Sequence, residues 1–75
     1  MYREQNTPKR EVLGRYVILR AFKNRRLERH AESDNRKYAE LCARALIACS
    51  KANHVEHVQL IDIAQGNTLL YEGRA

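Results

Sequence analysis

The sequence predicts an α+β domain of order β-β-α-β-β, in which one helix packs on one face of an antiparallel sheet. Three observations lead to this fold. An alanine-rich segment with helical periodicity covers residues 33–53, a run of β-branched and aromatic residues precedes it, and a second such run with a glycine turn follows it. The chain has 75 residues, which suits one domain. We expect a flexible N-terminal arm over residues 1–11 and the domain over residues 12–75.

The first predicted hairpin covers residues 15–32. Residues 15–23 (RYVILRAFK) favour a strand, residues 24–26 a turn, and residues 27–32 a second strand. Because Arg20 shares a face with Tyr16, we expect this face to meet solvent or a partner. The opposite face, which carries Val17, is then expected to meet the helix.

A helix over residues 9–31 is the alternative for this segment. Val12, Tyr16 and Leu19 have suitable spacing. Two helices followed by a hairpin would resemble a winged helix-turn-helix. The unbroken YVIL run and Gly14 both disfavour a helix, so we rank the strand interpretation first.

The predicted helix covers residues 33–53 (SDNRKYAELCARALIACSKAN). Ser33, Asp34 or Asn35 can cap its first turn. Glu40 and Arg44 have the spacing of a surface ion pair. One apolar stripe is predicted as its core side, and its centre consists of Tyr38, Leu41, Cys42, Ala45, Cys49 and Ala52. Five further apolar residues widen this stripe, namely Ala39, Ala43, Leu46, Ile47 and Ala48.

The second predicted hairpin begins with a strand over residues 55–64 (VEHVQLIDIA) and returns over residues 68–72 (TLLYE). Gly66 and Asn67 are expected to form a tight two-residue turn. That turn would place Gln65 opposite Thr68, and Leu60, Leu69 and Tyr71 would then share one apolar face. Only one face of the sheet can cover the helix. We therefore predict that these three residues form a dimer interface or a partner surface.

Charge is distributed unevenly along the chain. The net charge is +5, and residues 20–37 carry seven Lys or Arg residues against three acids. The cations around the first predicted turn are Arg20, Lys23, Arg25, Arg26 and Arg29, with His30 beside them. Such a basic hairpin tip suits phosphates. Tyr16 and Phe22 could stack on bases. We predict nucleic-acid or ribonucleoprotein binding through these five cations.

The remaining motifs predict no enzyme, no cofactor and no metal. His54 and His57 are three residues apart, so on a strand they point to opposite faces. Cys42 and Cys49 are about 10.5 Å apart along a helix, beyond disulfide reach. They suit a reducing compartment. The sequence contains neither a membrane-spanning run nor a signal peptide, so we expect a cytoplasmic protein.

The segments HAESD and VQLIDIAQGNTLLYEG flank the alanine-rich helix. With the basic hairpin, this layout over residues 15–73 resembles small α+β proteins of phages and mobile elements, including some anti-CRISPR inhibitors. The resemblance implies a stoichiometric protein–protein inhibitor or adaptor as an alternative function, acting through an apolar sheet face. A homodimer is expected in either case.

Overall fold

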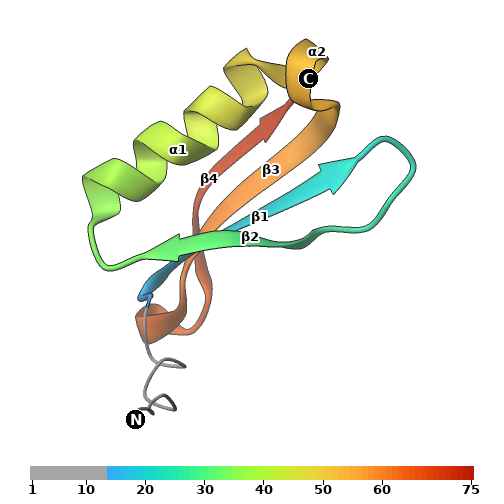
Figure 1. Cartoon of the computed structure of the whole chain (residues 1–75). Coiled ribbons are helices and arrows are strands. Elements are labelled where there is room, and N and C mark those ends of the chain that lie inside the picture. Colours follow the sequence, from blue (N-terminus) through green and yellow to red (C-terminus); the bar gives the residue numbers. More distant parts are fainter. Residues whose placement is uncertain (1–13) are drawn as a thin grey trace, which may run out of the picture.

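The computed structural model describes residues 14–75, which form one sheet, one main helix and two short helical turns (Figure 1). The elements in chain order are β1 (Tyr16–Phe22), β2 (Glu28–Ser33), α1 (Arg36–Ala48), α2 (Ser50–Asn53), β3 (Val55–Asp62), the 3-10 turn η2 (Ile63–Gln65) and β4 (Thr68–Arg74). The expected arm over residues 1–11 lies outside the described residues.

The four strands form one antiparallel sheet in the order β2-β1-β3-β4. Helix α1 lies across one face of this sheet, which we call the helix face, and we call the other the open face (Figure 1). The predicted β-β-α-β-β fold is thereby confirmed. The winged helix-turn-helix alternative is wrong, because Tyr16–Phe22 is a central strand.

Strand β1 turns its faces the opposite way from the prediction. Tyr16 and Ile18 lie in the hydrophobic core with Ala39 and Ala43 of α1. Ile18 stands opposite Leu60 of β3, and both are at most 1% exposed. The sequence predicts that the face with Tyr16 meets solvent, because Arg20 lies on it. Arg20 nevertheless fits the helix face, because its guanidinium stacks on the Phe22 ring (4.4 Å) and lies 3.6 Å from Glu28.

Helix α1 begins and ends inside the predicted range. The Asn35 side chain accepts a hydrogen bond from the Tyr38 N–H (2.9 Å) and caps the first turn. The helix ends at Ala48, and Cys49 separates it from α2. The predicted pair of Glu40 with Arg44 is wrong, since Glu40 pairs with Arg36 at 3.3 Å. Arg44 instead lies over the Tyr71 ring, 4.7 Å from its centroid.

The residues of α1 that face the sheet belong mostly to the widened side of the predicted stripe and not to its centre. Ala39 and Ala43 are fully buried, and Cys42, Leu46 and Ile47 pack against the core beside them. Five of the six residues at the centre of the predicted stripe are exposed, and the two large ones are Tyr38 (59% exposed) and Leu41 (67% exposed). Small alanine side chains let the helix backbone approach the sheet closely. The helix therefore buries Ala39 and Ala43 against the sheet and exposes two large residues, Tyr38 and Leu41.

The turn between β3 and β4 is longer than predicted. The Asp62 carboxylate accepts a hydrogen bond from the Ala64 N–H (3.0 Å), which starts η2 and removes residues 63–65 from the ladder. Gly66 and Asn67 follow with left-handed backbone (φ 66° and 61°). Asp62 therefore pairs with Thr68, and the predicted pairing of Gln65 with Thr68 is wrong.

Candidate nucleic-acid interface

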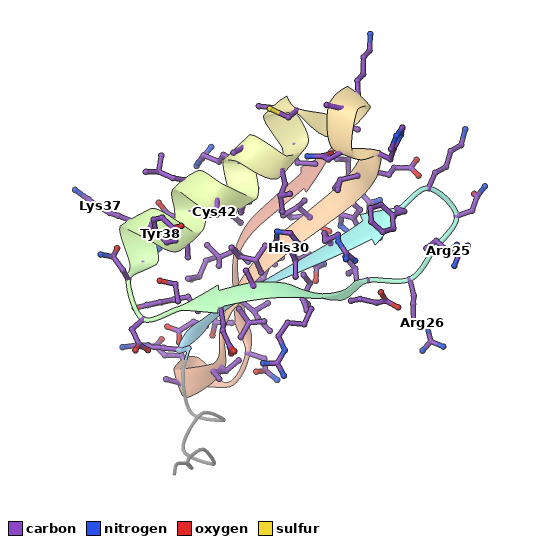
Figure 2. All side chains as sticks on the ribbon, in the orientation of Figure 1. Arg25, Arg26, His30, Lys37, Tyr38 and Cys42 are labelled. Atoms are coloured by element: carbon purple, nitrogen blue, oxygen red, sulfur yellow. The ribbon has the colours of Figure 1, made fainter. Side chains whose placement is uncertain are left out.

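The β1–β2 turn carries the cations of the candidate interface. The Arg25 N–H donates to the Phe22 carbonyl (3.0 Å), and Asn24 adopts a left-handed conformation (φ 63°), which together close the turn. Lys23, Arg25 and Arg26 are exposed. Figure 2 shows Arg25 and Arg26 on the outer side of this turn, away from α1. Within residues 14–75, no ion pair joins any of these three cations to a carboxylate.

The other two predicted cations are held by neighbours. Arg20 is stacked on Phe22, and its side chain is only 21% exposed. Arg29 pairs with Glu32 at 3.0 Å on the open face. The predicted set of five therefore divides into three exposed turn residues and two whose charge is partly compensated. His30 is the extra residue of a bulge in β2, and Figure 2 shows it between β2 and α1, away from the turn.

A hollow of about 370 Å³ lies beside the turn, where the open face ends. The lining combines Arg25 and Arg26 from the turn with His57 of β3 and Arg74 of β4. Glu56 is the acid among the lining residues. The sequence did not point to His57 or Arg74, because both come from the second hairpin. Only the pairing of β1 with β3 places that hairpin beside the basic turn.

His57 is fixed in this hollow by a carboxylate. Its Nε2 lies 2.6 Å from a Glu72 oxygen that also accepts a hydrogen bond from Gln59 (3.1 Å). These bonds, from Gln59 first and then from His57, hold the pKa of Glu72 below its ordinary value. Arg74 approaches the same carboxylate at 3.7 Å. Glu72 thus orients two basic side chains at the edge of the hollow.

A second hollow, of about 310 Å³, lies at the same end of the molecule. Lys23 of the turn lines it together with Lys51 of α2 and His54, the left-handed residue that ends α2. Glu56 borders both hollows. One end of the domain therefore carries Lys and Arg side chains from three segments, the β1–β2 turn, α2 and β4, and we call it the cationic end. It consists of Lys23, Arg25, Arg26, Lys51, His54, His57 and Arg74.

The two aromatic residues predicted to stack on bases, Phe22 and Tyr16, differ in their exposure. Phe22 is 40% exposed beside the turn, with Arg20 over its ring. Tyr16 is buried in the core, so its expected role in base stacking is wrong. A base could therefore stack at Phe22 only beside or in place of the Arg20 guanidinium.

The three residues predicted to form an interface do not share one surface. Leu60 is fully buried beneath α1, and Tyr71 packs at the margin of the same core. Leu69 pairs with Ile61 after a bulge between Leu60 and Ile61. It is 47% exposed. Leu69 alone of the three is available to a partner, because the bulge moves it to the open face.

In the part of the chain that the structure describes, no three His, Cys, Asp or Glu side chains come together as metal ligands would. No helix among these residues has the length and apolar character needed to cross a membrane.

Comparisons with protein-family models, with curated proteins and with solved structures found no match. The resemblance to small proteins of phages and mobile elements stays a prediction.

Proposed function

We propose that the protein is a small, non-enzymatic module that binds nucleic acid, free or within a ribonucleoprotein, through its cationic end. The observation that carries this proposal is the turn of Lys23, Arg25 and Arg26, exposed and without an ion pair among the described residues. Lys51 extends the same positive surface on one side. Arg74 borders it on the other side, where its charge is partly compensated by Glu72 at 3.7 Å. Phosphate contacts of this kind gain much of their free energy from counterion release.

The side chains around the cationic end favour contacts with the phosphate backbone of a nucleic acid over contacts with its bases. The residues of β1 and β3 on the open-face side of the sheet are Val17, Leu19, Ala21, His57, Gln59 and Ile61. Val17 and Ala21 are buried, the other four are half-buried, and none of the six is aromatic. Phe22 is the exposed aromatic residue next to the cations. We therefore expect binding with weak sequence preference and a strong dependence on salt.

The test is fluorescence anisotropy with a labelled single strand and a labelled duplex, measured over a salt series. The triple variant K23A/R25A/R26A should weaken binding at least tenfold. It should also reduce the slope of log K against log salt by about 2 to 3, since each lost phosphate contact contributes about 0.7 to 0.9.

The matched control for this experiment is R36A/K37A/R44A. It removes the same number of positive charges from three exposed residues of α1. This control should bind with an affinity within about threefold of that of the unchanged protein, and it should keep most of the slope of log K against log salt. Equal losses in the two triple variants would mean that net charge, and not the cationic end, drives binding, and would refute the proposal.

The alternative function is a stoichiometric inhibitor or adaptor of phage or mobile-element origin, which binds a protein through the open face. Leu69 supports it, since this residue is 47% exposed on that face beside Ile61. Either function fits a cytoplasmic protein, where the free thiols of Cys42 and Cys49 would stay reduced. A complex that survives moderate salt and is lost on Leu69→Glu would favour this alternative.

A further inference from the structure

The outer face of α1 carries the two most exposed large hydrophobic residues of the described chain. Tyr38 is 59% exposed and Leu41 is 67% exposed, compared with 47% for Ile63 and Leu69 and 40% for Phe22. They lie on one side of the helix, three residues apart. Leaving both in water costs hydrophobic free energy that burial against a partner would recover.

These residues begin a regular pattern along the helix. Tyr38, Leu41, Ala45 and Ala48 are spaced by three, four and three residues, and all four are exposed. This spacing is that of the a and d positions of a coiled-coil seam. The core of the domain uses other positions of α1, since Ala39 and Ala43 are the buried ones. We call the four exposed residues the outer seam.

Positive charge flanks the outer seam on one side. Lys37 and Arg44 are seven residues apart, so they lie on the same side of α1, each just before a seam residue. In coiled-coil terms they occupy g positions. Figure 2 shows Lys37 projecting from the first turn of α1, beside Tyr38. The single acid of α1, Glu40, is paired with Arg36 at 3.3 Å. The Arg44 guanidinium lies over the Tyr71 ring of β4, 4.7 Å from its centroid.

A second copy of this chain does not suit the outer seam. In an antiparallel helix pair the g positions face each other, which would bring Lys37 and Arg44 against the cations of the other copy. In a parallel pair, the g positions of one helix face the e positions of the other. The e positions of α1 are the uncharged Cys42 and Cys49. Neither arrangement compensates the positive charge, whereas Asp or Glu residues on a different helix would do so.

We propose that the outer seam is a docking surface for an amphipathic helix of another protein, with its apolar stripe flanked by acidic residues. Tyr38 and Leu41 provide the large contacts at one end of the seam. Ala45 and Ala48 let the partner helix approach closely at the other end. This surface is separate from the cationic end, so the inference does not depend on the proposed function.

The test uses two synthetic helical peptides of about three heptads with leucine at the a and d positions. One peptide has Glu at its flanking positions, and the other has Lys. We expect the acidic peptide to bind at least tenfold more tightly in anisotropy titrations. Y38S/L41S should lose this binding, and K37E/R44E should reverse the preference between the two peptides. Circular dichroism checks that each variant is folded.

Two control variants separate docking from attraction by net charge and from other apolar surfaces. K23A/R25A/R26A and Leu69→Ser should each keep the affinity for the acidic peptide within about threefold. The proposal is overturned if the cationic-end variant loses as much binding as K37E/R44E. It is also overturned if Y38S/L41S binds normally, or if light scattering shows a dimer that Leu41→Ser dissociates.

Discussion

At the scale of single residues, one ion pair joins the two halves of the chain. Arg15 precedes β1, and its Nε and Nη2 lie 2.9 and 3.0 Å from the two carboxylate oxygens of Asp62. Asp62 is 4% exposed at the end of β3, and it also starts η2. The Arg15 hydrogen bonds lower the pKa of Asp62, with a contribution from the Ala64 N–H, while burial acts in the opposite direction.

The Asp62 pair predicts a definite pH dependence of stability. Because the pKa of Asp62 in the folded state is below its ordinary value of 3.8, the stabilisation is fully present above that pH and is lost as the pH falls through the folded pKa. Asp62→Asn should therefore lower the midpoint of thermal unfolding by several degrees at pH 7. The difference from the unchanged chain should shrink below about pH 4.

Differential scanning calorimetry at several pH values measures this effect. Asparagine can still accept the Ala64 N–H, so the substitution mainly removes the charge. Glu40→Gln is the control, since it breaks an exposed pair with Arg36 and should change the midpoint little at any pH. If Asp62→Asn lowered the unfolding midpoint by the same amount at pH 3 and at pH 7, the charge of Asp62 would not be the cause of the lower midpoint.

At the scale of elements, the sequence was sufficient to predict the four strands and the main helix, but not the η2 turn or which sides of α1 and β1 are buried. The YVIL run and the alanine-rich segment are strong local signals, and both predicted the right structure. The side of α1 that is buried could not be read from its sequence, because apolar residues cover more than half of the helix surface. Which part of that surface meets the sheet depends on close approach at Ala39 and Ala43.

The orientation of α1 can be tested by adding volume to its alanines. Ala43→Leu should lower the free energy of unfolding by about 1–3 kcal/mol, because a fully buried position against the sheet has no room for a larger side chain. Ala45 lies on the outer face, so Ala45→Leu should change the free energy of unfolding by less than about 0.5 kcal/mol. Urea denaturation measures both, and the reverse order would support the centre of the stripe predicted from sequence.

At the scale of the whole molecule, the candidate interface depends on strand order. The sequence predicted the cations of the β1–β2 turn, since they are neighbours in the chain. It could not predict Arg74, His57 or Lys51, because they reach the turn only when β1 pairs with β3 and α2 closes the same end. The predicted apolar interface failed for a related reason. The bulge between Leu60 and Ile61 separates Leu69 from Leu60, and nothing in the local pattern marks that bulge.

The expected homodimer is a prediction at this scale. If the open face is its interface, light scattering should give twice the chain mass of 8.8 kDa, and Leu69→Glu should reduce it to one chain mass. Leu41→Glu places the same charge on the opposite side of the molecule and should leave the dimer intact. A single chain mass for the unchanged protein at high concentration would rule out this dimer.

The two edge strands of the sheet, β2 and β4, differ in how readily they can pair with a strand of another chain. The outer strand β2 (ERHAES) is rich in charge and interrupted by the bulge at His30, features that discourage edge-to-edge pairing. The other outer strand, β4 (TLLYEGR), has apolar residues in its first half. If two chains joined through β4, the resulting eight-stranded sheet would present β2 at both ends. Growth would stop there, so pairing through β4 would give a closed pair of chains and not a filament.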